Sequence, residues 1–402
     1  MRSSQLLRLI TVNIGIAYSF AVSYPRDDSF YGQNRAAYFQ DNDSAGNSLV
    51  ALQISEYDGT LSNPVKISTG GKGLAGLVAV SQDSVVVDGN YIFTINAGDN
   101  TFSLFIIDGR DPTHPKLVGN ALPTLGQTPV SVTYSDKLKT ACALNSGSTA
   151  GITCFKISTH GPTPQGGLRF IPQTELNDSS APPPGPLVLS ADISFNPTST
   201  ALFATVRSNG ALPGLLYTYP ISPSGQISVT PIVTSLPSLP FLFSLNFLDN
   251  NPSHLFVTNP HQFSPGAAFL NIEYPSLKAS VEKIITIPGQ IASCWVAYAP
   301  QLDAVYIIDA ARPNVVTISP ETGEVTGQTS FPANNLVESG GADARVDRNW
   351  LYILSDDQMD PKVIIMEVGP EQVPTTVQEF DIFQQVGTIP GLMGMAIYPT
   401  EY

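Results

Sequence analysis

Short apolar strands recur along this chain, and each one ends in a polar residue. Seven such ends follow at intervals of 47 to 62 residues: YFQD at Asp41, YIFTIN at Asn96, TACALN at Asn145, LFATVR at Arg207, HLFVTN at Asn259, VYIID at Asp309 and YILSD at Asp356. A strand-based period of this length is typical of a β-propeller, in which each repeat forms one blade. The pattern therefore predicts an all-β, seven-bladed propeller that spans residues 24–402 as a single domain.

Each predicted blade begins with an inner strand that precedes the strand carrying the polar marker. We expect inner strands at DSVVV, PVSVTY, SADISF, FLFSLNF, SCWVAY and GADARV, which start near residues 83, 129, 190, 241, 293 and 341. The first blade has no such strand before it, whereas LMGMAIYP at residues 392–399 has no blade after it. The C-terminal strand should therefore dock beside residues 36–40 and close the ring.

Composition agrees with such a fold and limits the classes of molecule that the protein is expected to bind. Charged residues make up 13% of the chain, and its 34 Pro and 32 Gly suit many tight turns. The net charge is −14 with no cluster of Lys or Arg, so nucleic acid is not an expected partner. No later segment is long and apolar enough to span a membrane. We expect a monomer with neither a metal nor a cofactor. GxSxG, HExxH and CxxC motifs are missing from the sequence, so standard hydrolase and zinc chemistries have no support.

The N-terminal segment points to the secretory pathway. Arg2 and Arg8 precede an apolar stretch that runs to Val22 and is followed by Ser23. This arrangement is typical of a signal peptide, here residues 1–23, and predicts a secreted or cell-wall protein. An ordinary apolar extension is the alternative. Asn42 and Asn177 begin the two N-glycosylation sequons.

Two of the three cysteines lie on either side of one predicted hairpin. If Asn145 faces Gly151 across its turn, Cys142 falls opposite Cys154. Opposed residues of an antiparallel pair approach within disulfide range, so we predict a Cys142–Cys154 bridge, with two buried thiols as the alternative. Such a bridge suits an oxidising compartment. Cys294 is expected to be a buried free thiol.

In a propeller, the loops that enter inner strands and those that leave second strands share one face around the axial channel. The candidate site residues on this face are Lys72, Gln82, Asp83, Arg207, His261 and Arg312. Arg207 breaks the run of Asn and Asp markers and can clamp a carboxylate, although an interblade ion pair is the alternative. The other markers are interpreted as turn-stabilising residues rather than as a ring of Ca²⁺ ligands.

The remaining candidates are assigned by side-chain chemistry. Lys72, in the glycine-rich STGGKGLAG, together with Arg312 and Gln82, is predicted to bind substrate. His261 or Asp83 would transfer a proton, and His261 would do so more easily near neutral pH. A solvated loop histidine is the alternative for His261.

The first two predicted blades resemble a known family. GNSLVALQISEYDGTLSNPVKISTGGKG and SQDSVVVDGNYIFTINAGDNTFSLF look like the lactonase-family seven-bladed propellers, and SADISFNPTSTALFATV and ASCWVAYAP are later echoes. That family includes bacterial 6-phosphogluconolactonases and fungal 3-carboxymuconate cyclase-like proteins. The paired cysteines look like the secreted fungal branch. The resemblance implies a small carboxylate or lactone in the axial channel.

The resemblance also implies acid–base chemistry, either lactone hydrolysis or closure of a carboxylate onto an alkene. Fungal muconate cyclases are described as using a His/Glu pair with arginines, and by predicted location His261 and Glu338 are the candidates for this pair. The third blade has no histidine near its inner strand. Two other functions stay open: a non-catalytic extracellular binding platform, and a ring-closing cyclase of secondary metabolism.

Overall fold

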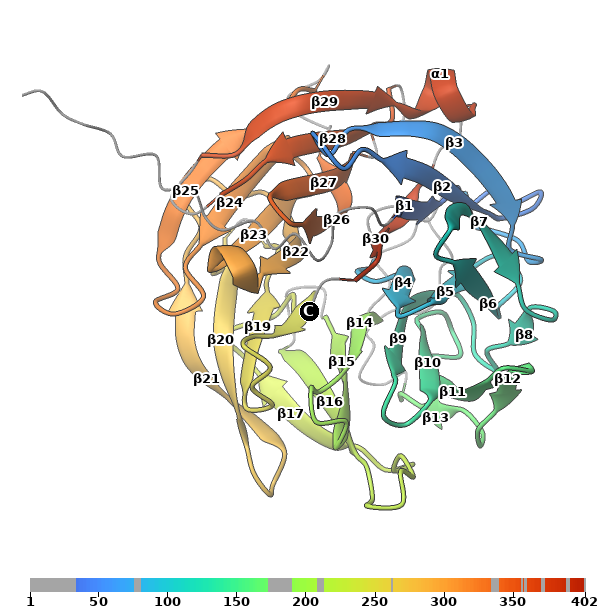
Figure 1. Cartoon of the computed structure of the whole chain (residues 1–402). Coiled ribbons are helices and arrows are strands. Elements are labelled where there is room, and N and C mark those ends of the chain that lie inside the picture. The colour runs from blue at the N-terminus through green and yellow to red at the C-terminus, as the bar shows by residue number, and fades with distance from the viewer. Residues whose placement is uncertain are drawn as a thin grey trace, which may run out of the picture. The chain divides into compact units, whose positions relative to one another are not determined.

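The computed structural model describes residues 34–75, 81–172, 190–207, 213–261, 263–333, 340–355, 357, 360–369, 373–387 and 391–400. The predicted signal peptide, Asn177, Glu338 and Asp356 lie outside these residues. The described strands form seven antiparallel sheets around one axis, which confirms the seven-bladed propeller (Figure 1).

Blade one combines strands from both ends of the chain, and blades two to four follow its first three strands in sequence order. Blade one contains β1 (Arg35–Gln40), β2 (Ser48–Ile54), β3 (Leu61–Ser68) and β30 (Met393–Tyr398). Blade two contains β4 (Val85–Asp88), β5 (Tyr91–Asn96), β6 (Thr101–Asp108), β7 (Asp111–Leu117) and β8 (Leu122–Pro123). Blade three contains β9 (Pro129–Ser135), β10 (Thr140–Asn145), β11 (Gly151–Ser158), β12 (Gly161–Pro164) and β13 (Arg169–Phe170). Blade four contains β14 (Ser190–Phe195), β15 (Ala201–Val206), β16 (Gly214–Pro220) and β17 (Ile232–Leu236).

Blades five to seven follow the same order, from the inner to the outermost strand. Blade five contains β18 (Leu245–Phe247), β19 (His254–Thr258), β20 (Ala267–Glu273) and β21 (Lys278–Ile285). Blade six contains β22 (Ser293–Ala299), β23 (Ala304–Asp309), β24 (Asn314–Ile318) and β25 (Val325–Ser330), with the short 3₁₀ helix η2 (Pro300–Leu302). Blade seven contains β26 (Gly341–Asp347), β27 (Trp350–Ser355), β28 (Lys362–Glu367) and β29 (Thr375–Asp381), followed by α1 (Ile382–Val386).

The two ends of the propeller share blade one, as the unpaired C-terminal strand predicts. β30 pairs antiparallel with β1, and Ala36 lies opposite Tyr398 (Figure 1). Blade one therefore takes three strands from the beginning of the chain and its inner strand from the end. Ring closure removes two exposed sheet edges that would otherwise be open to pairing with other chains.

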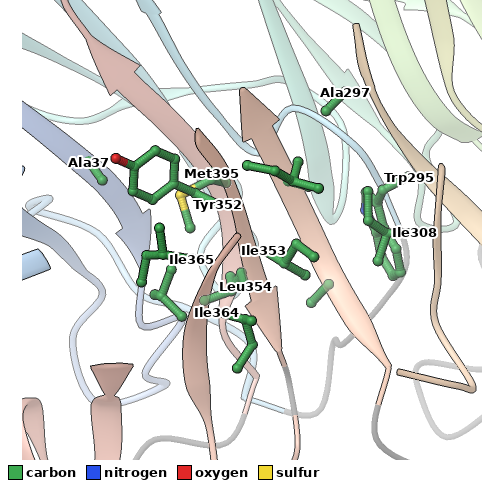
Figure 2. Close-up of a cluster of buried hydrophobic side chains, with 14 of the residues drawn as sticks. Ala37, Trp295, Ala297, Ile308, Tyr352, Ile353, Leu354, Ile364, Ile365 and Met395 are labelled. Atoms are coloured by element: carbon green, nitrogen blue, oxygen red, sulfur yellow. The ribbon is translucent and has the colours of Figure 1, made fainter. Parts of the chain in front are cut away.

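Burial falls from the axis outward along each blade. All residues of β9 and β30 are buried, whereas four of the six residues of β25 are exposed. Apolar packing is continuous between blades: in Figure 2, Trp295 and Ile308 of blade six, Ile353 of blade seven, and Met395 of blade one belong to one cluster. Packing between neighbouring sheets therefore supplies the core.

One inner strand begins later than its sequence predicts. The fifth was expected from Phe241, but β18 begins at Leu245. Upstream of β18, the backbone N–H of Phe243 donates to the carbonyl of Thr258, and the N–H of Ser244 donates to the Thr258 hydroxyl. These irregular bonds hold the segment beside β19 without a regular ladder.

The predicted disulfide is present in the third blade. Cys142 of β10 lies opposite Cys154 of β11 in the ladder, and their sulfurs are bonded. Cys294 is free and buried.

Removing this bridge should lower stability without changing the fold. The bridge closes a loop with a sequence separation of 12 residues, and a loop of this size is worth about 2–3 kcal/mol through restriction of the unfolded chain. We expect the Cys142→Ala/Cys154→Ala variant to lose about this free energy of unfolding in urea titrations. Alkylation of the denatured, unreduced wild type should modify Cys294 alone. Three modified thiols would contradict the bridge.

Candidate functional site

A short segment before β4, Ser81–Ser84, crosses the axial channel; we call it the crossing segment. Trp295 of blade six donates its indole N–H to the carbonyl of Ser81 over 2.8 Å. The N–H of Gln82 donates to the carbonyl of Ala191 in blade four over 3.3 Å. Because blades four and six do not neighbour blade two, these bonds require the segment to reach across the axis.

Side chains of the crossing segment form hydrogen bonds that hold the segment in place. Gln82 is 1% exposed, and its Oε1 accepts the N–H of Val296 over 2.9 Å. The hydroxyls of Ser81 and Ser84 both donate to the carbonyl of Val130, over 2.6 and 2.8 Å. Gln82, predicted to bind substrate, instead has a structural role. The crossing segment separates the two ends of the channel.

Arg207 lies at the channel end where the inner strands begin. Val206 pairs with Ser190, the first residue of β14, so Arg207 follows at that end. Its guanidinium carbon lies 5.5 Å from the centre of the Phe243 ring, and the residue is 4% exposed. Burial lowers the pKa of Arg207 to about 10, with a partly opposing electrostatic contribution from Cys294. The cation is thus partly desolvated, which strengthens any interaction with an anion.

Two hydroxyls near the same ends of the inner strands have no hydrogen-bond partner in the described structure. Ser190 begins β14 and Ser293 begins β22; they are 0% and 1% exposed, and neither Oγ is bonded. Buried polar atoms are usually paired, so these two unpaired hydroxyls are exceptions within the core at this end of the channel.

His261 approaches the same stretch of blade five as Arg207. The His261 ring packs against the Phe241 ring, with their centroids 4.8 Å apart. Phe241 lies two residues before Phe243, the residue whose ring Arg207 contacts. The ring Nδ1 lies 3.0 Å from the hydroxyl of Ser264, and Nε2 makes no hydrogen bond within the described residues. Arg207 and His261 therefore both contact one short segment, Arg207 at Phe243 and His261 at Phe241.

The two other predicted cations have surroundings of their own. Lys72 is exposed, and Gly73 beside it packs so tightly that a Cβ would lie 2.0 Å from the backbone of Asn42. The glycines of STGGKGLAG therefore serve chain packing rather than the close approach of a ligand. Arg312, predicted on the channel face, instead donates to the carbonyl of Gly289 over 2.8 Å and lines a cavity of about 370 Å³ with Gln328 of outermost strand β25.

The other end of the channel holds a second polar group, which the sequence interpretation missed. Asp83 forms an ion pair with Arg345 of β26, and the two side chains are 19% and 25% exposed. They line a cavity of about 250 Å³, whose walls come mainly from the C-terminal residues of β22, β26 and β30. Asp83 belongs to the crossing segment and lines this second cavity, whereas Arg207 lies at the channel end where the inner strands begin, so the two do not form one acid–base site. The only sequence signal for Arg345 was its alternation with Asp343 in GADARV.

Two buried aspartates connect neighbouring inner strands. Asp192 accepts the N–H of Leu245 over 2.8 Å, and Asp343 accepts the N–H of Met395 over 3.1 Å. Both are 0% exposed. Burial raises the pKa of Asp192 to about 8 and raises that of Asp343 well above its usual range.

These shifts predict that stability falls as pH rises. The unfolded chain releases the Asp192 proton near pH ~4, whereas the folded protein keeps it up to about pH 8. The contribution of Asp192 to the free energy of unfolding is therefore complete below pH ~4, and it is lost as the pH rises from there through about 8. Urea midpoints should decline more steeply over this window in the wild type than in Asp192→Asn, while exposed Asp303→Asn should follow the wild type. Equal slopes in wild type and Asp192→Asn would contradict this assignment.

The polar markers at the strand ends have structural partners. Asp309 accepts the N–H groups of Ile291 and Ala292, which lead into the same blade, at 2.9 to 3.0 Å. Asn145 donates to the carbonyl of Thr124 over 3.2 Å and Asn259 accepts the N–H of Phe241 over 2.8 Å. The described Asn and Asp markers thus tie each second strand to neighbouring turns and entering loops, whereas Arg207 has a different environment.

Asn42 does not offer a free amide for glycosylation. It is 0% exposed, and its Nδ2 donates to the carbonyl of Leu74 over 2.9 Å and to the sulfur of Met393 over 3.3 Å. A glycan on this nitrogen would displace both contacts, so the sequon prediction at Asn42 conflicts with the packing.

Among the described residues there is no cluster of three or more potential metal ligands, and no helix suited in length and apolarity to crossing a membrane.

Solved structures of other proteins share the fold of this chain. No family model matches the sequence, and no curated protein does. A solved structure from Lactobacillus plantarum is 13% identical, with 91% of this chain and 99% of that chain covered and a TM-score of 0.61. Two structures described as candidate 6-phosphogluconolactonases also have TM-scores of 0.61. The one from Bacteroides fragilis is 13% identical, with 90% of this chain and 98% of that chain covered. The one from Bacteroides uniformis is 12% identical, with 91% of this chain and 99% of that chain covered. At this identity the likeness establishes the fold.

Proposed function

We propose that this propeller acts on a small carboxylate or lactone at the channel end that contains Arg207 and His261. The supporting observation is the buried Arg207 guanidinium, held over Phe243 beside a segment that also contacts His261. A planar guanidinium can bind a carboxylate through two parallel hydrogen bonds. The fold shared with candidate 6-phosphogluconolactonases makes lactone ring opening the reaction to test first.

In this proposal Arg207 holds the substrate's carboxylate or polarises its carbonyl, and His261 moves the proton. For hydrolysis, His261 Nε2 takes a proton from water as the water oxygen bonds to the lactone carbonyl. The ring C–O bond then breaks, and the departing alkoxide takes that proton back. In the reverse direction the same groups close a hydroxy acid into a lactone with loss of water. A neutral imidazole is suited to such transfer near neutral pH.

The test is turnover of a panel of γ- and δ-lactones, followed by pH-stat titration. We expect His261→Gln to lower kcat by about 100-fold or more, as for loss of a general base. Arg207→Lys should chiefly raise KM because it keeps the charge but loses the planar fork. Lys72→Ala and Arg312→Lys, at the two other predicted cations, are the matched controls and should retain activity. Full activity in both Arg207→Lys and His261→Gln would overturn the proposal.

A non-catalytic binding platform is the second candidate. It is favoured by the internal bonding of Gln82, Asn42 and Asp83, which leaves few described groups available for catalysis. Under this function the wild type would bind small carboxylates saturably without converting them, and Arg207→Lys would weaken binding.

We also propose a secreted fungal protein, supported by the Cys142–Cys154 bridge. Intact-mass analysis of the protein from its native host tests this through removal of residues 1–23.

A further inference from the structure

A second cavity lies at the other end of the channel from Arg207. It measures about 250 Å³, just below the ~300–1,000 Å³ usual for drug-sized ligands. Asp83, Arg345 and Asn246 supply polar groups, while Val296 and Ile397 contribute to an apolar wall. Asp83 and Arg345 are partly exposed, so both can contact a molecule in the cavity.

The charges around this cavity are balanced within the protein. Asp83 is paired with Arg345, and Asp347 is paired with the buried Arg35 of β1. An anion would compete with Asp83 for the guanidinium, and a cation would find only carboxylates that are already paired. Because each would disrupt an existing ion pair, the arrangement favours a neutral ligand.

The polar atoms that remain available include both donors and acceptors. A carboxylate has about four lone-pair positions and a guanidinium has five N–H groups. Besides its pair with Asp83, Arg345 donates from Nη1 to the carbonyl of Ala344 over 2.8 Å and lies 3.4 Å from Asp343, and the Asp83–Arg345 pair keeps its remaining bonding capacity on its exposed side. Asn246 adds a buried Nδ2 that has no hydrogen-bond partner. One hydroxyl can donate to Asp83 while accepting from Arg345, and a second can accept from Asn246.

We propose that this cavity binds a neutral, polyhydroxylated molecule of monosaccharide size, with its C–H face against the valine and isoleucine wall. Neighbouring hydroxyls match the paired carboxylate and guanidinium, and the unbonded Asn246 amide gains an acceptor. The site is distinct from the proposed carboxylate site because the crossing segment lies between them.

Isothermal titration with D-glucose, D-galactose and D-mannose tests this proposal, with D-gluconate as the charged comparison. We expect saturable binding of at least one neutral sugar and weaker binding of gluconate. Asn246→Ala should raise the Kd about tenfold, the effect of one lost hydrogen bond. Arg207→Lys, at the other end of the channel, should leave the Kd unchanged, and circular dichroism checks that both variants are folded.

Several results would overturn the proposal. Saturable binding by none of the three neutral sugars would do so, as would tighter binding of gluconate than of any of them. An unchanged Kd in a folded Asn246→Ala variant would remove the assigned donor. A large loss of affinity in Arg207→Lys would move the sugar to the opposite end of the channel. Because lactone turnover is assayed separately, failure here is distinguishable from failure of the proposed function.

Discussion

A chain that ends at Gly387, before β30, should fail to form a stable folded protein. The missing strand contributes buried Met393, Met395, Ile397 and Tyr398 to the packing around blade one. Burial of one large apolar side chain is worth about 1.5–3 kcal/mol, so the loss is comparable with the ~5–15 kcal/mol stability of a typical protein. Circular dichroism and thermal melting should show no cooperative transition.

A circular permutant provides the matched control for this truncation. Tyr398 lies opposite Ala36, so the end of β30 is adjacent to the beginning of β1. Placing residues 392–399 before Asn34 through a short turn should therefore restore the inner strand and the cooperative transition. A truncated chain that melts like the wild type would show that ring closure is not needed for stability.

Replacement of Arg35 by methionine should be the most damaging single substitution at the junction of blades seven and one. Arg35 Nε donates to Asp347 over 3.0 Å, and a second guanidinium nitrogen pairs with the same carboxylate. Both side chains are at most 2% exposed. Removing one partner of a buried pair leaves an uncompensated charge and costs about 3–5 kcal/mol. Urea unfolding measures this loss directly.

Two further variants separate the ion pair from simple loss of volume. Arg35→Met/Asp347→Leu removes both charges and should recover much of the stability, because apolar replacements of a buried pair are often tolerated. Lys362→Met disrupts a more exposed pair with Glu379, a carboxylate that is 39% exposed, and should cost less than ~1 kcal/mol. If Arg35→Met costs no more than Lys362→Met, the buried pair is not important for closure.

The repeat in the sequence was enough to predict the blades and their closure. Strand periodicity placed the inner strands, and the unpaired LMGMAIYP segment identified the composite first blade. The disulfide also followed from local register, because Cys142 and Cys154 belong to one hairpin. These features depend on neighbouring strands, whose pairing is encoded by alternation and by turns.

The contacts across the axis could not be predicted in the same way. Gln82 and Val296 are separated by 214 positions, and Asp83 meets Arg345 from a different blade. Periodicity indicates that a residue faces the channel but not its depth or its partner. For this reason periodicity groups Gln82 and Asp83 with Arg207, although Gln82 is bonded to Val296 within the core and Asp83 lines the cavity at the other end of the channel. Arg345 was missed because an inner-strand arginine had no evident counterion in the sequence.

The position of a bound hydroxy acid tests the central claim most directly. A crystal structure with the hydrolysis product of the best lactone should show its carboxylate against Arg207, with its hydroxyl toward His261. Electron density for the product only in the cavity lined by Asp83 and Arg345, with nothing at Arg207, would contradict the account.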